Sequence, residues 1–177
     1  MSKFTRDELE QAFRVYWRTG AVGEDWNAWC DLFTEDALYV EHMYGTMHGR
    51  EAIRAWIVPI MEKYGEIYTG YEWHVVDPDS GRVVLYVQNR RDDPSGKGTL
   101  DFPGVTILEY AGNGKWKLEE DFYSTAERDA AMRAYTDGCA KHDRKHPQKR
   151  TRGDWGHGAE WTRGGKTYAE RPPVPRS

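Results

Sequence analysis

Apolar residues in the amino-terminal third of the chain repeat with a helical period. The first set recurs at intervals of three or four residues and comprises Leu9, Ala12, Phe13, Tyr16 and Trp17. This spacing places the side chains on one face of a helix. The apolar residues from 26 to 33 predict a second amphipathic helix that ends near residues 34–36. Those from 53 to 64 predict a third helix, which Pro59 should kink or interrupt.

The middle of the chain alternates apolar and polar residues with a period of two, which is typical of β-strands. Strands are predicted over residues 37–44, 68–76, 82–89, 99–110 and 116–123. Gly45 and Gly49 bracket a predicted turn, and the sequence AGNG at 111–114 predicts a hairpin between the last two strands. The sequence STAE at 124–127 is a capping box that starts a last helix, which we expect to run through about residue 139.

Helices that precede strands predict an α+β fold, in which three helices pack into the concavity of a cone-shaped, curved antiparallel sheet. A C-terminal helix and an extended tail follow this cone. The length of 177 residues suits one domain. We therefore divide the chain into a cone domain, residues 1–140, and a basic C-terminal extension, residues 141–177.

Charge is distributed unevenly between these two parts. The extension holds ten Lys or Arg and four Asp or Glu, a net charge of +6, whereas residues 1–140 carry a net charge of −10. The acidic body repels phosphates and no nucleic-acid motif is present, so we expect no nucleic-acid partner. We predict instead that Trp155, Trp161 and Tyr168 dock on a neighbouring subunit, which makes the protein a homo-oligomer. The alternative is that the extension folds back on its own subunit.

Several classes of protein are disfavoured by what the sequence lacks. No apolar run approaches the roughly 20 residues that a membrane span needs, so we expect a cytoplasmic protein that does not bind membranes. Two cysteines, Cys30 and Cys139, cannot build a disulfide framework. The histidines are not grouped with cysteines or clustered carboxylates in metal-ligand spacing, and no phosphate-binding glycine loop is present. We expect neither a metal nor an organic cofactor.

The strand at 116–123 carries the first candidates for chemistry. Strict alternation places Glu120 on the same face as Trp116, Leu118 and Phe122, where its carboxyl group interrupts an apolar surface. Apolar surroundings raise the pKa of a carboxyl group and make it useful for proton transfer near neutrality. We predict that Glu120 and its neighbour Asp121 are catalytic. The alternative is that three consecutive acidic residues form a solvated strand end.

Three segments resemble a known family. The sequences WCDLFTEDA at 29–37, YVEH at 39–42 and GREAIRAW at 49–56 are similar to the SnoaL-like branch of the nuclear transport factor 2-like superfamily. The hairpin from FPGV at 102–105 through GKW at 114–116 resembles that branch too. The resemblance covers roughly residues 5–135 and implies the cone fold. It leaves the reaction open, since this fold hosts isomerases, dehydratases, cyclases, hydrolases and binding modules.

The resemblance also implies roles for individual residues. His42 stands where ketosteroid isomerases carry their proton-shuttling aspartate, and a histidine can accept and return a proton near neutral pH. Tyr16, or Trp17 beside it, corresponds to an oxyanion donor of the first helix. The histidine–aspartate dyad of the dehydratases is missing, because Val22 occupies its aspartate position. Glu120 or Asp121 could instead orient His42.

We expect an aromatic-lined pocket around these groups. The candidate substrate-binding residues are Trp17, Trp56, Trp73, His74, Trp116 and Asp101, and His74 is also a second candidate base. The tail-bearing dehydratases of the superfamily are trimers, so the resemblance favours a trimer over a dimer.

The chemistry open to such a pocket is proton transfer on a hydrophobic or aromatic small-molecule substrate. We expect a cofactor-independent lyase that acts on an aromatic or polycyclic alcohol or carbonyl compound by dehydration or retro-aldol elimination, for example with formaldehyde release from a lignin-type diaryl diol. The alternatives are a ketosteroid-isomerase-like isomerase, a polyketide cyclase and a non-catalytic binding module. Carboxylates and His42 facing one cavity would favour an enzyme, whereas a cavity lined only by Trp, Tyr and Leu would favour a binder.

Overall fold

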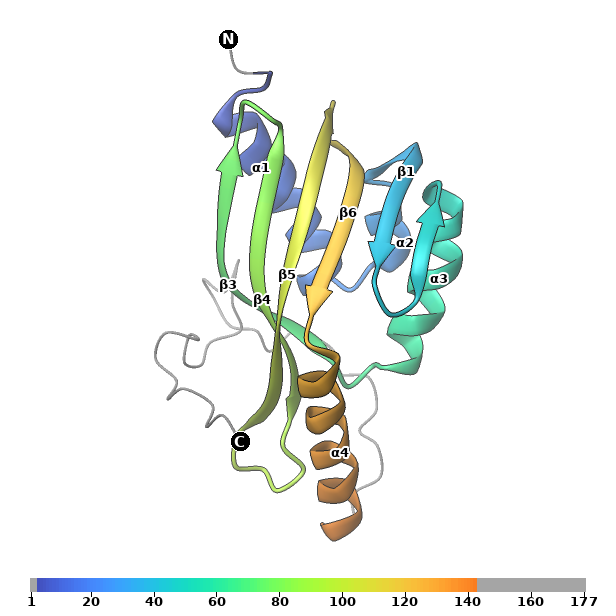
Figure 1. Cartoon of the computed structure of the whole chain (residues 1–177), viewed down its shortest axis with the longest axis vertical. Coiled ribbons are helices and arrows are strands. Elements are labelled where there is room, and N and C mark those ends of the chain that lie inside the picture. Colours follow the sequence, from blue (N-terminus) through green and yellow to red (C-terminus); the bar gives the residue numbers. More distant parts are fainter. Residues whose placement is uncertain (1–2, 143–177) are drawn as a thin grey trace.

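The computed structural model describes residues 3–142, which form a curved sheet with helices packed against it (Figure 1). The helices are α1 (Arg6–Trp17), α2 (Trp26–Cys30), α3 (Arg50–Lys63) and α4 (Thr125–Lys141), and a π-helical segment, η1 (Arg18–Val22), continues α1. Apart from its first two residues, the predicted basic extension lies outside the described part of the chain, and so do Trp155, Trp161 and Tyr168. Within residues 3–142, no helix is long and apolar enough to cross a membrane.

Six strands form one sheet in the order β2-β1-β6-β5-β4-β3. Their bounds are β1 Phe33–Glu41, β2 Gly45–His48, β3 Tyr68–Asp77, β4 Arg82–Asp92, β5 Thr99–Gly112 and β6 Lys115–Tyr123. The expected α+β class is confirmed. The β1–β6 pair is parallel and the other pairs are antiparallel, so the sheet is mixed.

The second helix and the first strand differ from their predicted bounds. α2 ends at Cys30, and the chain enters β1 at Phe33, which is fully buried. A four-residue apolar spacing such as Phe33 to Ala37 fits a helix and also fits alternate positions of a strand, which explains the misassignment. The predicted turn between Gly45 and Gly49 contains the short strand β2. Pro59 lies inside an uninterrupted α3.

The apolar face of α1 supplies a large part of the core. Its Leu9 and Phe13 are fully inaccessible to solvent, and Tyr16 and Trp17 are buried one turn further on. These side chains pack against the inward-facing residues of the sheet, where Trp116 is also fully buried. The hydrophobic burial that closes the cone therefore also fixes the position of Tyr16.

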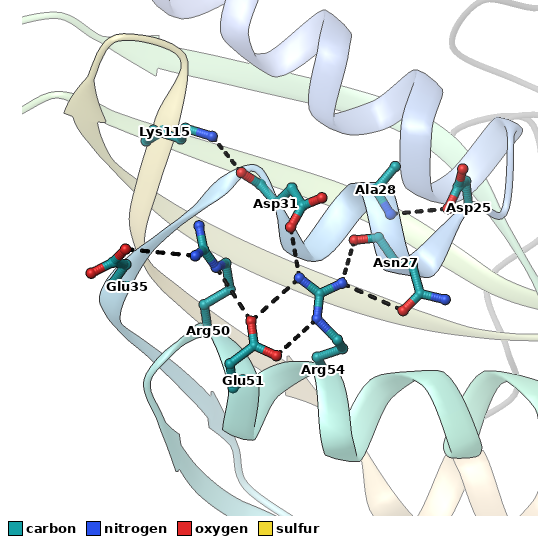
Figure 2. A network of polar contacts seen from close by, with 9 residues as sticks. All are labelled: Asp25, Asn27, Ala28, Asp31, Glu35, Arg50, Glu51, Arg54 and Lys115. Atoms are coloured by element: carbon teal, nitrogen blue, oxygen red, sulfur yellow. Dashed lines mark hydrogen bonds and ion pairs between the residues drawn. The ribbon is translucent and has the colours of Figure 1, made fainter.

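A polar network on the surface joins α3 to α2 (Figure 2). The Arg54 guanidinium of α3 donates to the carbonyl oxygen of Asn27, within α2, at 2.6 Å and to Oδ1 of Asp31, the C-cap residue of α2, at 2.6 Å. Glu51 holds the same guanidinium from within α3, with Nε 3.1 Å from its Oε2. Lys115, at the start of β6, donates to the Asp31 carbonyl oxygen. The network aligns the two helices that cover one side of the cone.

A β-bulge at Lys117 interrupts the alternation of β6. Glu109 of β5 pairs with Leu118, but the next pair along the ladder is Tyr110 with Trp116. Lys117 is therefore an extra residue on β6, and an extra residue shifts every later side chain to the opposite face. Trp116 points into the core on one side of the bulge, and Leu118 points outward on the other.

The bulge corrects the predicted faces of the last strand. Beyond it, Glu119 pairs with the fully buried Leu108, and Asp121 pairs with Thr106, so these two acids face inward. Glu120 faces outward. The prediction that Glu120 shares the face of Trp116 is wrong, because that prediction assumed uninterrupted period-two alternation.

A glycine of η1 tests how tightly the helical side of the cone is packed. A Cβ atom on Gly20 would lie 2.5 Å from Trp29 Cδ1, and the indole of Trp29 is itself buried. In an open helical site, Gly→Ala would stabilise the protein by about 0.5–1 kcal/mol. We expect Gly20→Ala instead to lower the free energy of unfolding in urea by about 1–3 kcal/mol, because the Trp29 ring must shift. A stabilised variant would show that this packing is loose.

Candidate active site

A cavity of about 210 Å³ lies between the helices and the inward face of the sheet. Its wall is mainly aromatic and apolar, with Trp17, Trp26, Trp29 and Trp56 contributed by the helical side. The indole N–H groups of Trp17, Trp26 and Trp56 are buried and have no hydrogen-bond partner within the residues that the structure describes. Buried N–H groups are normally paired, so these three donors are available to a ligand that carries oxygen atoms.

Three carboxyl groups lie at neighbouring inward positions of β1 and β6. In the parallel β1–β6 register, Tyr39 is opposite Glu119 and Glu41 is opposite Asp121. Glu119 and Glu41 are only 3% and 4% exposed, and both line the cavity together with Asp121. So many acids on one inward surface need compensating hydrogen bonds, because burying an unpaired polar group is unfavourable.

Tyrosine and threonine hydroxyl groups supply those hydrogen bonds. Tyr16 donates to Glu119 Oε1 at 2.7 Å, and Asp121 accepts from Tyr39 and from Thr106, each at 2.5 Å. The second carboxyl oxygen of Glu119, Oε2, is buried and has no hydrogen-bond partner in the described part of the chain. Glu119 therefore has one oxygen held by the protein and one oxygen left for a ligand.

Glu41 is anchored differently from the other two acids. Its Oε2 accepts from the backbone N–H groups of Met43 and Tyr44 at 2.7 and 2.8 Å. Its Oε1 accepts from the hydroxyl group of Tyr123. Three donors thus hold the Glu41 carboxylate, against two on Asp121 and one on Glu119, so we assign Glu41 a structural part in the cluster.

Burial divides Glu119 and Asp121 into an acid and a base. Desolvation by burial raises the pKa of Asp121 to about 6, although the hydrogen bonds from Thr106 and Tyr39 offset part of the effect. Desolvation, reinforced by the charge of Asp121, raises the pKa of Glu119 well above its ordinary value. Asp121 receives two hydrogen bonds that favour its ionised form, whereas Glu119 also carries the penalty of the nearby Asp121 charge, so Asp121 is the candidate base and Glu119 the candidate acid. Two carboxyl groups with separated pKa values are a recurrent arrangement in acid–base catalysis.

Four of the predicted site residues line this cavity. They are Tyr16, Trp17, Trp56 and Asp121. Burial and the nearby carboxyl groups raise the pKa of Tyr16 well above its ordinary value, so its hydroxyl group stays protonated and can donate.

The predicted location of His42 inside the cone is wrong. Its side chain is 54% exposed, and neither His42 nor Glu120 lines the cavity. His42 follows the outward positions Leu38 and Val40 in the alternation, packs on the exposed ring of Phe122, and contacts Glu120 Oε1 at 2.9 Å. The predicted pairing of His42 with Glu120 exists, but on the outer side of the sheet.

The other four predicted substrate-binding residues also lie away from the cavity lining. Trp73 is 48% exposed and stacks on Tyr86, and Trp116 is fully buried in the core. His74 Nε2 is 2.8 Å from a carboxylate oxygen of Glu10, and Asp101 forms an ion pair of 3.0 Å with Arg90. Local sequence could not separate pocket tryptophans from core or surface ones, because an apolar periodicity shows which face of an element is buried and not whether that face borders a cavity.

Glu119, Glu41, Tyr39, Tyr123 and Thr106 were missed by sequence reasoning. The available signal was the acidic run at 119–121 together with Glu41, two strands that end in carboxylates. This signal identifies the site only when the β1–β6 pairing and the bulge at Lys117 are known. In the part of the chain that the structure describes, no group of three or more His, Cys, Asp or Glu is arranged to hold a metal ion.

The fold and this site belong to a class of small cone-shaped α+β proteins with an enclosed pocket. Residues 11–119 match the SnoaL-like domain family, which is more than half of the chain, and the protein belongs to that family. A comparison with curated protein sequences finds no match.

Several solved structures share the fold of this chain. A ketosteroid isomerase-like protein from Catenulispora acidiphila in complex with trimethylamine is 23% identical, with a TM-score of 0.55, over 75% of this chain and 98% of that one. SalBIII is an epoxide hydrolase/cyclase-like enzyme with a role in pyran ring formation in polyether salinomycin, and it is 17% identical to this chain. The match has a TM-score of 0.56 and covers 68% of this chain and 94% of SalBIII. TerC, co-crystallised with polyporic acid, is 15% identical with a TM-score of 0.58, and the match covers 71% of this chain and 98% of TerC.

The raised pKa of Asp121 predicts a specific dependence of stability on pH. Between pH 4 and pH 6 the folded protein keeps a proton on Asp121 that the unfolded chain has lost, so this group makes stability fall as pH rises. The rise in the pKa of Asp121 from its ordinary value to about 6 corresponds to ~3 kcal/mol of unfolding free energy. Relative to wild type, Asp121→Asn should therefore gain stability by about that amount between pH 4 and pH 7 in urea unfolding. Parallel pH profiles for the two proteins would contradict a buried, raised-pKa Asp121.

Proposed function

We propose that the protein is a cofactor-independent enzyme that uses Asp121 and Glu119 as a base and an acid on a small, largely apolar carbonyl compound or alcohol. The observation that carries this proposal is the pair of inward carboxyl groups on one wall of the cavity, both with pKa values raised by burial but held by unequal sets of hydrogen bonds. Their cavity is otherwise aromatic, which suits a ring-bearing substrate.

Each group has a role that its contacts support. The Asp121 carboxylate removes a proton from the carbon next to a carbonyl group, and its pKa of about 6 is close to the working pH of a general base. The protonated Glu119, held through Oε1 by Tyr16, presents Oε2 to the oxygen on which negative charge develops. Tyr39 orients Asp121 through its short hydrogen bond.

A lyase reaction follows when the substrate carries a hydroxyl group β to the carbonyl. Removal of the α-proton by Asp121 gives an enolate, and expulsion of the hydroxyl group, protonated by Glu119, gives water and a conjugated carbonyl compound. In retro-aldol cleavage Asp121 is again the base, but it takes the proton of the hydroxyl group while the carbon–carbon bond breaks. Formaldehyde release from a diaryl diol remains a substrate-level prediction.

An isomerase or cyclase is the second catalytic candidate. Both reactions begin with the same proton abstraction and return the proton elsewhere, or use the enolate carbon to form a ring. This candidate is supported by the shared fold of a ketosteroid isomerase-like protein and of a cyclase-like enzyme. Sequence identities of 23% and 17% show the fold alone and not the reaction.

A binding module is the non-catalytic candidate. It is disfavoured by the three inward acids.

The predicted homo-oligomer is kept as a proposal. Its basis is the charge asymmetry between the acidic cone and the basic extension. A trimer or a dimer would each fit that asymmetry.

Hydrogen exchange with deuterated water tests the acid–base proposal without knowledge of the natural substrate. With 2-tetralone or a 4-aryl-4-hydroxybutan-2-one, the wild-type protein should accelerate replacement of the α-hydrogens by deuterium, measured by NMR. Asp121→Asn should reduce this rate by about 100-fold or more, since it removes the base. The hydroxy ketone also separates the reactions, because dehydration yields an ultraviolet-absorbing enone.

Glu120→Gln is the matched control for Asp121→Asn. It makes the same carboxyl-to-amide change at the next residue of β6, but on the outer side of the sheet. We expect an exchange rate within about twofold of wild type. If the wild-type protein binds the ketones and exchanges no α-hydrogen, the enzyme proposal fails and the binding module is supported.

A further inference from the structure

Arg91 is a charged residue at an inward position of the sheet. It lies near the end of β4 and lines the cavity together with Leu85, Val87 and Asn89, the alternate residues that precede it on the same face. Its side chain is only 1% exposed. A fully buried arginine normally has most of its five N–H groups paired, because an unpaired buried charge is strongly unfavourable.

The protein pairs only one side of this guanidinium. Arg91 Nε donates to Glu66 Oε1 at 3.2 Å, and the guanidinium carbon lies 5.7 Å from the centre of the Tyr135 ring. The two terminal nitrogens, Nη1 and Nη2, are buried and have no hydrogen-bond partner among residues 3–142. Four N–H donors of a cation are therefore left without an acceptor.

The preceding residue shows what a satisfied arginine looks like at this place. Arg90 is also buried, at 5% exposure, but it faces the other side of the strand. Both its Nε and its Nη2 lie 3.0 Å from Asp101 Oδ2. The fold thus supplies a carboxylate to the terminal nitrogen of Arg90 and none to those of Arg91, although the two are neighbours.

Arg91 lies in the wall between two cavities. The second cavity has a volume of about 290 Å³ and is lined by Lys63, Tyr64, Glu66, Arg91, Met132, Tyr135 and Thr136. Tyr64, Arg91 and Met132 line both cavities. Met132 has an unbranched side chain, of the kind that adapts its shape to a neighbouring ligand.

The position of Arg91 separates it from the acid–base pair. Asp121 pairs with Thr106, and Thr106 pairs with Leu85 of β4, six residues before Arg91. At about 3.3 Å per residue, the backbone of Arg91 lies roughly 20 Å along the strand from the row of Asp121. A molecule that reaches both groups must be elongated and must carry its anion away from the reacting carbon.

The charge at the site favours a carboxylate over a phosphate. Glu66 already neutralises Arg91 through Nε, so a doubly charged group would meet repulsion from that carboxylate. A singly charged, planar carboxylate matches the two parallel N–H donors of a guanidinium.

We propose that Arg91 binds the carboxylate of an elongated, ring-bearing carboxylic acid, whose other end lies at Asp121 and Glu119. This inference rests on the proposed function for the identity of the ligand as substrate, and the anion site itself stands on the contacts of Arg91. Binding energy gained at a remote anion positions the reacting end of a substrate.

Biphenyl-4-carboxylate and its neutral amide, biphenyl-4-carboxamide, form the test pair, measured by titration calorimetry at pH 7.5. We expect the wild-type protein to bind the carboxylate at least about 10-fold more tightly than the amide. Arg91→Met should abolish this preference, and Arg91→Lys should restore part of it. Lys63→Met, which removes the other cation of the second cavity, should leave the preference unchanged.

The comparison of two ligands on the wild-type protein holds even if Arg91→Met does not fold. Equal binding of the two compounds, no binding of the carboxylate at millimolar concentration, or a preference that survives in folded Arg91→Met would each overturn the anion site. Asp121→Asn separates this inference from the proposed function, because it should keep the carboxylate preference. If the wild-type protein prefers the carboxylate to the amide but does not exchange the α-hydrogens of the ketones, the acid–base proposal is refuted and the anion site is supported.

Discussion

The single extra residue at Lys117 is the constraint on which the site depends. Without that bulge, the alternation that starts at the fully buried Trp116 would place Glu120 inside the cone and Glu119 and Asp121 outside. With it, one tryptophan of β6 packs in the core and two acids of the same strand reach the cavity. A bulge is a common device for redirecting side chains beside an active site, because it changes the face of a strand without breaking the sheet.

Burial then determines what these acids can do. In water, Glu119 and Asp121 would both be ionised at neutral pH, and neither would be an effective acid or base. Inside the cone, the charge on one disfavours the charge on the other, and Tyr16, Tyr39 and Thr106 supply unequal sets of hydrogen bonds. The acid that receives two short hydrogen bonds, Asp121, ionises first. The arrangement is unfavourable for folding, so the large aromatic core around Tyr16 and Trp29 also serves to hold these acids in place.

Regular elements and family were predictable from the sequence because they depend on repeated patterns. The period of α1, the Gly112-Asn113-Gly114 turn and the helix start at Ser124 each involve several residues that agree, and the structure has the helix, the turn and Ser124 as the N-cap that accepts from the Glu127 N–H. The site was less predictable because it depends on a one-residue shift in strand register and on which face of a strand is buried. Asp121 was identified only as the neighbour of Glu120, and His42 was placed inside because it stands where ketosteroid isomerases carry their catalytic aspartate. Tyr39 and Glu41 occupy the inward face of β1 instead, and the choice between the two faces depends on the parallel pairing with β6.

Arg91 illustrates a second limit of sequence patterns. On β4, arginines at adjacent positions read as a polar strand end, and nothing local distinguishes Arg90, paired with Asp101, from Arg91, whose terminal nitrogens lack acceptors. The distinction requires knowing which carboxylates the fold brings close. It also gives the cavity a direction: acids and tyrosines at the β1–β6 side, aromatic rings along the middle, and a cation towards α4. A pocket that is apolar throughout selects ligands by size and shape, whereas one with chemically different ends also fixes which end of a ligand meets the acids. Orientation of this kind is what a proton-transfer site needs, because Asp121 must meet one particular carbon of its substrate.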